Sequence, residues 1–145
     1  MDIVIDSNII FSILLKADGR TAALFFKLAQ SHNLYISDFS FEELNKHQSR
    51  LLKISKLSSV EFEKLKFSIF SHFSIITSAL FSEEIITRAY EMIKAIDIDD
   101  LPFVGAALFI DGILWTGDKT LYTGLLKKGF EKVYNSKQIE LLINT

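Results

Sequence analysis

The sequence predicts an α/β fold of three layers, in which helices cover both faces of a central, mainly parallel sheet of four or five strands. Two observations carry this prediction. Residues 3–5 (Ile-Val-Ile) form a β-branched apolar run without alternation, as expected for a strand buried on both faces of a parallel sheet. Strand and helix patterns then alternate to the end of the chain without a linker-like stretch. Residues 1–145 are therefore expected to form a single domain.

The expected elements follow one another in regular order. Strands are predicted at residues 3–6, 34–37, 74–77, 113–116 and 132–134. Helices are predicted at residues 9–16, 21–31, 41–55, 59–72, 83–95, 103–110, 119–128 and 137–143. The helix pair across residues 41–72 departs from simple strand–helix alternation, so we expect a helical hairpin that protrudes from the sheet. Phe67 and Phe70 share one helix stripe there, which favours core packing over a partner-binding ridge.

Composition narrows the class of protein. With 49% hydrophobic and 23% charged residues, the chain has an ordinary globular composition, and a net charge of −2 gives no overall attraction to nucleic acid. A polyanion would need a local basic patch or metal ions. The absence of Cys excludes disulfides, thiolate nucleophiles and Cys-based metal sites. No apolar run approaches the roughly 20 residues that span a bilayer and no signal peptide is visible, so we expect a cytoplasmic protein without membrane partners.

Two acidic residues directly follow predicted strands. Asp6 ends the first strand, and helical spacing begins immediately after it. Asp118 follows the strand at 113–116, with Gly117 providing a tight turn. The carboxyl ends of strands are where open α/β sheets bind their ligands. Taken alone, however, Asp6 is better explained as a helix N-cap, and the same explanation is available for Asp118.

Glu43 follows the second strand within Ser-Phe-Glu-Glu-Leu. Ser40 and Glu43 have the S-x-x-E spacing of a capping box, which would be a sufficient structural role. Glu42 would point about 100° away around the helix, so only one of the two is expected to face the cleft. Basic residues follow at helical spacing, namely Lys46, Arg50 and Lys53. Such a row is usually a solvated face, but beside a phosphate-cleaving site it would hold an RNA backbone.

Three further acids precede Pro102 and the helix predicted at 103–110: Asp97, Asp99 and Asp100. Acids and a Pro both suit the first turn of a helix, but a cap uses one or two side chains at most. Three carboxylates within four positions repel one another. The cluster therefore indicates a bound cation more than a cap.

All these acids lie at a strand-to-helix crossing or at a helix start, positions that share one edge of a parallel sheet. Carboxylates gathered there cannot all stay ionised without compensating positive charge. The expected cofactor is Mg²⁺ or Mn²⁺, because hard divalent cations prefer oxygen ligands. Zinc is disfavoured, since the chain has no Cys and its three His residues form no H-E-x-x-H motif.

Four short motifs, in this order and spacing, resemble the PIN-domain family: D-S-N, S-x-F-S-F-E-E-L, D-D-L-P-F-x-x-A-A-L and T-G-D-K-x-L. The resemblance covers nearly the whole chain and implies a metal-dependent ribonuclease with RNA as substrate. Many small single-domain members are toxins of bacterial toxin–antitoxin pairs, and an RNA-processing nuclease is the other role that it implies. An antitoxin protein is thus one expected partner. Family habit and the mean hydropathy of +0.27 also favour a homodimer.

The resemblance implies a role for each acid. Asp6 matches the family's first Asp, and Glu43, directly before Leu, matches its Glu. Asp100 and Asp118 match its third and fourth acids. Together these four would form the catalytic, metal-binding set.

Two other residues would support that set. Asn8 matches a polar residue that helps to orient the first Asp, and Thr116 matches the hydroxyl just before the fourth acid. Asp99 is an extra carboxylate that departs from the family pattern. It would be an outer-shell ligand or would replace Asp100.

The resulting hypothesis is hydrolysis of an RNA phosphodiester by water, with Asp6, Asp100 and Asp118 holding metal and Glu43 as ligand or as partner of a bound water. A phosphatase of the haloacid dehalogenase type is an alternative, although it needs a second Asp where this chain has Asn8. Receiver domains need a lone Asp after the third strand, which this chain lacks. A non-catalytic α/β binding module whose acids cap helices is a third alternative.

Overall fold

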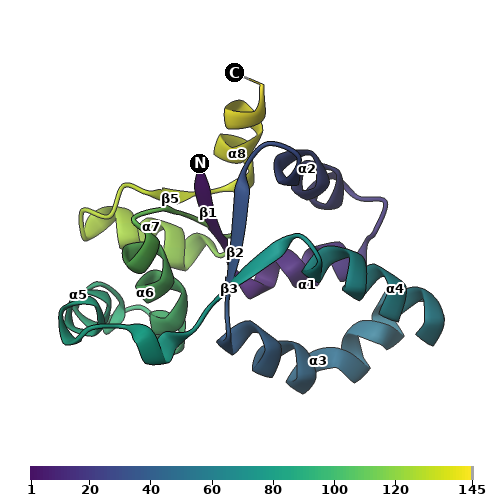
Figure 1. The fold of residues 1–145 in the computed structure, drawn as a ribbon, viewed down its shortest axis with the longest axis horizontal. Helices are drawn as coiled ribbons and strands as arrows, with labels where there is room; N and C mark the ends of the chain where they lie inside the picture. Colours follow the sequence, from purple (N-terminus) through teal and green to yellow (C-terminus); the bar gives the residue numbers. More distant parts are fainter. Residues whose placement is uncertain (145) are drawn as a thin grey trace.

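A five-stranded, all-parallel sheet forms the centre of the protein, whose computed structural model describes residues 1–144 (Figure 1). The strands are β1 (Asp2–Ile5), β2 (Asn33–Ser37), β3 (Phe73–Ile76), β4 (Ile113–Trp115) and β5 (Val133–Tyr134). Their order across the sheet is β3-β2-β1-β4-β5. The predicted α/β class is confirmed, and the sheet has five strands that are all parallel.

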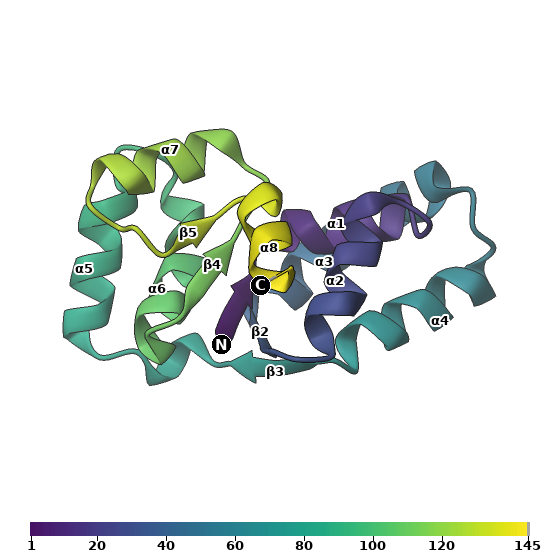
Figure 2. The same cartoon turned by 90° about the horizontal axis from the view of Figure 1, so that it is seen from above.

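Helices cover both faces of this sheet. They are α1 (Ser7–Leu15), α2 (Arg20–Ala29), α3 (Phe39–Ser55), α4 (Ser59–Phe70), α5 (Glu83–Ile93), α6 (Leu101–Ile110), α7 (Lys119–Lys127) and α8 (Ser136–Ile143). Figures 1 and 2 show α5, α6 and α7 on one side and α1 to α4 on the other. Two short 3₁₀ turns that the sequence does not predict, η1 (Ser78–Leu80) and η2 (Ile98–Asp100), complete the connections. Among residues 1–144, no helix has both the length and the apolar character needed to cross a bilayer.

Strand β1 is buried on both faces, as its unbroken apolar run predicts. Ile3 and Ile5 belong to the core under α1, α2 and α3, whereas Val4 belongs to the core under α5, α6 and α7. All three side chains are fully buried. Successive side chains of a strand point to opposite faces, so both cores share β1 as their common wall.

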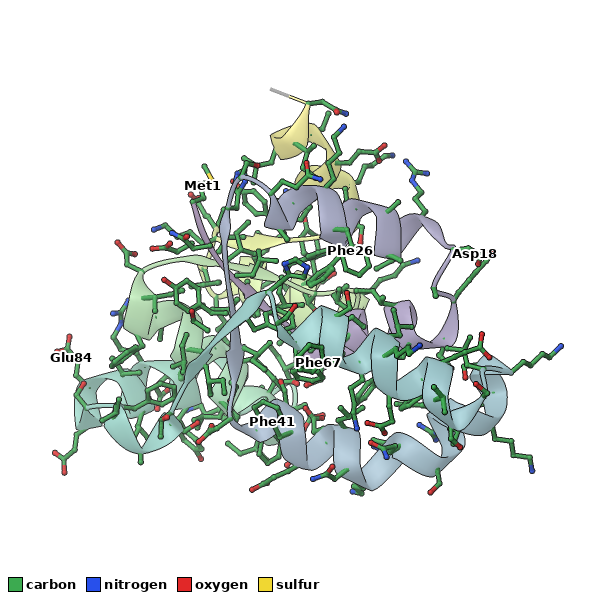
Figure 3. The ribbon with its side chains drawn as sticks, turned by 45° about the vertical axis from the view of Figure 1, so that its right-hand side comes forward. Met1, Asp18, Phe26, Phe41, Phe67 and Glu84 are labelled. Carbon is green, nitrogen blue, oxygen red and sulfur yellow. The ribbon has the colours of Figure 1, made fainter. Side chains whose placement is uncertain are left out.

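Helices α3 and α4 form the predicted hairpin, which extends away from the sheet (Figure 2). Phe70 packs inside it against Phe41, with ring centroids 5.1 Å apart. Phe67, one turn earlier on α4, is 78% exposed, so the expected core role is wrong for this residue. Figure 3 shows Phe67 and Phe41 on facing helices of the hairpin. The hairpin has too few neighbours to cover both Phe side chains of the stripe.

The strand order places a topological switch point next to β1. From β1 the chain moves outward through β2 and β3, and then returns to the other side of β1 with β4 and β5. The carboxyl ends of β1 and β4 are therefore neighbours, with Ile5 paired to Trp115. In sheets of this kind, ligands bind at the carboxyl ends of the strands on either side of the switch point.

We predict that Gly112→Ala destabilises the fold. A Cβ at position 112 would lie 2.6 Å from the carbonyl oxygen of Asp2, and that backbone belongs to the central strand and cannot move aside. Overpacking of this kind costs about 2 kcal/mol in the free energy of unfolding, measurable by urea denaturation. Gly117→Ala is the matched control, because its nearest contact would be an ordinary 3.6 Å. Equal stability of the two variants would contradict the prediction.

Candidate active site

Asp6 is the most deeply buried acid at the switch point. It follows β1, and its Oδ1 caps α1 by accepting the N–H of Asn8 at 3.4 Å. Its Oδ2 accepts a hydrogen bond from Oγ1 of Thr116 at 2.7 Å, and only 5% of Asp6 is exposed. Burial raises the pKa of Asp6 to about 6. The hydrogen bonds from Thr116 and Asn8 lower this pKa in part, and repulsion from Glu43 and Asp118 raises it by smaller amounts. The N-cap interpretation is therefore confirmed, but the carboxylate also has a long-range partner.

Two contacts tie the start of α1 to the turn between β4 and α7. Thr116 accepts the backbone N–H of Asp118 at 3.0 Å while it donates to Asp6. Oδ1 of Asn8 accepts the N–H of Gly117 at 3.3 Å. Both residues that the family resemblance marks as supporting thus make contacts between the two neighbouring strand ends. The hydroxyl and the amide fix the relative position of Asp6 and Asp118.

Asp118 caps α7, as the sequence suggests. Its Oδ1 accepts the N–H groups of Thr120 and Leu121 at 2.9 and 3.1 Å. Its Oδ2 has no hydrogen-bond partner among the described residues. One oxygen is therefore structural, and the other is available to a ligand.

Glu43 is half-buried on α3, whereas its neighbour Glu42 is exposed. The predicted capping box with Ser40 is wrong, because α3 begins at Phe39 and both residues lie inside the helix. Oε1 of Glu43 is buried without a hydrogen-bond partner within the described part of the chain. Burial raises the pKa of Glu43, and Ser7, His47 and Lys46 offset this in part. An unpartnered buried carboxylate oxygen needs an explanation outside the fold itself.

Asp100 and Asp99 differ sharply in their surroundings. Asp100 stands at the start of α6, half-buried, with no side-chain capping bond. Burial, followed by repulsion from Asp6, Asp97 and Asp118, raises the pKa of Asp100 to about 7. Asp99 is exposed, and the turn is closed by Asp97, whose Oδ1 accepts the N–H of Asp99 at 3.0 Å. Asp99 raises the pKa of Glu43, whereas the pKa of Asp100 responds to Asp6, Asp118 and Glu43, so Asp100 is the one of the pair that is coupled to all three other acids.

The four acids from distant parts of the sequence influence one another. The pKa of Asp6 responds to Glu43 and Asp118, and that of Asp100 responds to all three. None of the four forms an ion pair in the part of the chain that is described. In residues 1–144, however, no three acidic or His side chains are close enough together to ligate one ion. The site thus brings together carboxylates whose negative charge is not compensated, but their oxygens are not arranged in advance around a metal position.

The basic row of α3 lies along one edge of this acidic site. Lys46, Arg50 and Lys53 are all exposed, as expected for a solvated face. Lys46 is close enough to lower the pKa of Glu43. Nη2 of Arg50 lies 3.4 Å from Nδ1 of His47. The row begins at the acidic site and leads away from it along the hairpin.

Two buried serines belong to the site; the sequence analysis does not single out Ser7, and it gives Ser40 only a capping role. Oγ of Ser7 donates to Oγ of Ser40 at 2.9 Å, and both residues are nearly fully buried. The pair joins the first turn of α1 to α3 and thereby brings Glu43 toward Asp6. Ser7 directly follows Asp6, and Ser40 lies within the motif that contains Glu43. Their positions within these motifs were the signal in the sequence that could have identified both serines as residues of the site.

Comparisons with known proteins give one family and one fold. A family model described as PIN domain matches residues 4–138. No curated protein matches the chain. The structure of PAE2754 from Pyrobaculum aerophilum is similar, with a TM-score of 0.70, 10% identity, and coverage of 99% of this chain and 90% of that one. VapBC2 from Rickettsia felis, bound to a DNA fragment from their promoter, gives a TM-score of 0.62, 18% identity, and coverage of 93% and 98%. At these identities the structures establish the shared fold.

We predict that the metal-free protein loses stability between pH 5 and 7. The pKa of Asp6 is about 6 in the folded state against 3.8 when unperturbed, so the folded state holds the proton more tightly. Its contribution is fully present below the unfolded pKa and is lost as pH rises through the folded one. Asp6 alone accounts for about 1 kcal/mol over this interval.

Urea unfolding in EDTA at stepped pH measures this effect. Asp6→Asn is the control, because it removes the ionisation while its oxygen keeps the cap and its NH₂ can donate to Oγ1 of Thr116 in a reversed hydrogen bond. The decline should be smaller in Asp6→Asn than in the wild type. Parallel profiles would show that the buried carboxylate of Asp6 is not the titrating group.

Proposed function

The chain belongs to the PIN-domain family, and on that premise we propose that it is a nuclease that hydrolyses RNA phosphodiester bonds with the help of Mg²⁺ or Mn²⁺. The observation that supports this most is the group of four acids at the switch point, which carries no compensating cation among the described residues. Carboxylates with a purely structural role are usually exposed, and they are rarely half-buried next to one another. Their position is explained if they serve a ligand.

The donor set fits a hard divalent cation. Its atoms are all carboxylate oxygens, and several of them have no hydrogen-bond partner in the described residues, among them Oε1 of Glu43, Oδ2 of Asp118 and both oxygens of Asp100. Mg²⁺ commonly retains several waters and uses only one or two carboxylates, so three converging side chains are not required. Asp6, Asp100 and Asp118 would hold the ion, with Glu43 as a ligand or a partner of its water. When bound, such an ion lowers the pKa of a water and neutralises charge on the scissile phosphate.

The protein's own residues would position the reaction. Thr116 holds Oδ2 of Asp6, so the carboxylate cannot rotate freely. Oε1 of Glu43, with its raised pKa and no other partner in the described chain, is suited to accept the proton of the attacking water. The exposed cations Lys46, Arg50 and Lys53 would bind phosphates of the RNA beyond the cut bond. Asp99, exposed beside the site, would act through water as an outer-shell ligand.

We further propose that the protein is the toxin of a toxin–antitoxin pair, acting in the cytoplasm as a homodimer of single-domain subunits. The similarity to the VapBC2 structure supports an antitoxin protein as partner. An RNA-processing nuclease is the alternative role for the same site. The helix-capping bonds of Asp6 and Asp118 are what a non-catalytic binding module would also have, and the following experiments separate the two.

Asp6→Asn should remove RNA cleavage without unfolding the protein. Asn is as good an N-cap as Asp, because its oxygen can still accept the N–H of Asn8, and its NH₂ can donate to Oγ1 of Thr116 in place of the original bond, but it cannot compensate a cation. Because loss of an outer-shell partner already costs about 10- to 100-fold in metal sites, we expect a loss of at least about 100-fold. Cleavage of a labelled single-stranded RNA with Mn²⁺ measures it. Wild-type activity in this variant would refute the assignment.

Asp100→Asn and Asp99→Asn should differ in metal binding. The two substitutions remove the same charge from adjacent positions, but only Asp100 is coupled to Asp6 and Asp118. Wild-type protein should gain about 2.7 kcal/mol of stability at a Mn²⁺ concentration 100-fold above Kd. Thermal unfolding with and without Mn²⁺ should show this gain nearly intact in Asp99→Asn and lost in Asp100→Asn. No gain in the wild type would favour the binding module.

A further inference from the structure

A pocket between the start of α7 and the start of α8 adjoins the acidic site. Its volume is about 300 Å³, at the lower end of the range for small-ligand sites. The side chains that give it its chemistry are Asp118, Lys119, Tyr122, Asn135, Ser136 and Lys137. We call it the α7–α8 pocket. It shares Asp118 with the acidic site and contains none of the basic residues of α3.

The pocket is rich in unused hydrogen-bond donors. Oγ of Ser136 accepts Nε1–H of the buried Trp115 at 3.1 Å, which leaves the hydroxyl proton without an acceptor among the described residues. Oδ1 of Asn135 accepts the N–H of Gln138 at 3.0 Å, so its side-chain NH₂ is free to donate. Lys119 and Lys137 are exposed, and neither has an ion-pair partner in residues 1–144. These groups together favour an anionic ligand.

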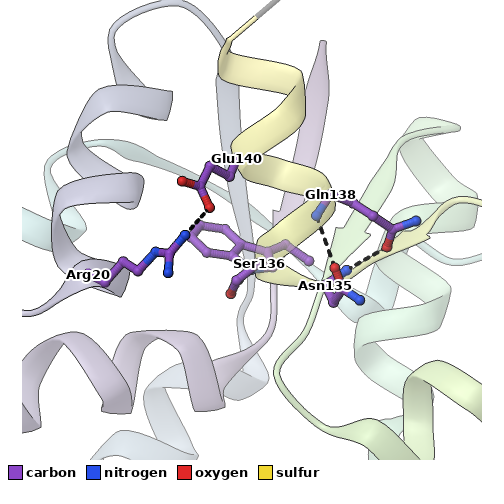
Figure 4. Close-up of polar contacts among 6 residues, drawn as sticks. Arg20, Asn135, Ser136, Gln138 and Glu140 are labelled. Atoms are coloured by element: carbon purple, nitrogen blue, oxygen red, sulfur yellow. Dashed lines mark hydrogen bonds and ion pairs between the residues drawn. The ribbon is translucent and has the colours of Figure 1, made fainter.

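The wall of the pocket is held in place before any ligand arrives. Figure 4 shows the reciprocal pair between Asn135 and Gln138, together with the ion pair between Arg20 and Glu140 that ties α8 to α2. Trp115, which anchors Ser136, belongs to the strand next to β1. A site whose donors are fixed in this way loses little entropy on binding.

Charge in the pocket is opposite to charge in the neighbouring site. Two ammonium groups and one carboxylate line it, and one oxygen of that carboxylate is used by the cap of α7. The acids at the switch point repel a polyanion, and the net charge of −2 gives no general attraction. An RNA strand that reaches the acids therefore needs local cations on either side of them. The basic row of α3 supplies cations beside Glu43, and the α7–α8 pocket supplies cations beside Asp118.

We propose that the α7–α8 pocket holds one nucleotide of single-stranded RNA next to the bond that is cut, with its phosphate on Lys119 and Lys137 and its base against Tyr122. This inference rests on the ribonuclease activity proposed above and names the residues that recognise its substrate. Aromatic rings stack on unpaired bases without regard to sequence, and lysines contact the phosphates between them. The pocket has room for about one such unit.

The test compares two double variants that lose the same charge. Lys119→Gln/Lys137→Gln removes both cations of the pocket, and Lys127→Gln/Lys128→Gln removes two from the far end of α7, about 12 Å away along the helix. The probe is a fluorescein-labelled, unstructured 12-nucleotide RNA, with Kd measured by anisotropy in EDTA between 50 and 200 mM salt. The pocket variant should bind about tenfold more weakly at low salt, and its salt slope should fall by about 0.7, the value for one phosphate contact on a single strand. The control should remain within about twofold of wild type.

Tyr122→Leu tests the base contact separately. It should weaken binding by about fivefold or more while leaving the salt slope unchanged, because stacking involves no counterion release. Thermal unfolding verifies that the variant is folded at the assay temperature. Unchanged binding would overturn the role of Tyr122.

The outcomes also separate this proposal from the nuclease activity. Wild-type cleavage with Mn²⁺, combined with equal RNA affinity of the pocket variant and the wild type, would overturn the pocket and leave the nuclease intact. Equal weakening of RNA binding in both double variants would also overturn the pocket, since the loss would then come from the lower net positive charge of the protein and not from the position of the lysines. RNA binding that depends on Lys119 and Lys137 without cleavage would support the pocket and refute the nuclease. A wild type that neither binds nor cleaves RNA would overturn both.

Discussion

The buried hydrogen bond from Thr116 to Asp6 is the contact on which the candidate site depends most. It joins residues 110 positions apart across the pairing of β1 with β4. The carboxylate that accepts it is nearly fully buried, and such a group is costly to ionise without partners. Because the same hydroxyl accepts the backbone N–H of Asp118, one side chain sets the position of two acids. Glu43 and Asp100 then approach a pair whose geometry is already fixed.

The clustered carboxylates of the site lower the free energy of unfolding of the metal-free protein. Burial raises the pKa of both Asp6 and Asp100, and repulsion from neighbouring carboxylates raises each of them further: Glu43 and Asp118 act on Asp6, and Asp6 itself acts on Asp100. The nearest cations lie beside the acids rather than among them, so they do not neutralise the cluster. Active sites commonly carry such a penalty, which the rest of the structure must offset. Here the two cores on either side of β1 supply the compensating burial.

Local signals in the sequence predict the elements well and their long-range contacts poorly. Every strand and α-helix lies within two residues of its predicted ends, because buried β-branched runs and helical spacing are local patterns. The Ser40–Glu43 capping box fails because the hydroxyl of Ser40 contacts Ser7, 33 residues away, which no local motif reveals. The exposure of Phe67 depends likewise on how far the hairpin extends from the sheet. The α7–α8 pocket depends on helices that meet only in the folded chain.

The central place of the first strand has a consequence for synthesis on the ribosome. Strand β1 is made first, yet its partner β4 is made more than a hundred residues later. Contacts of such long sequence separation form late in folding. A nascent chain thus exposes Asp6 long before Thr116 and Asp118 exist. The acidic constellation therefore closes only after β4 and the start of α7 have been made, and its carboxylates stay apart while residues 1–118 are being synthesised.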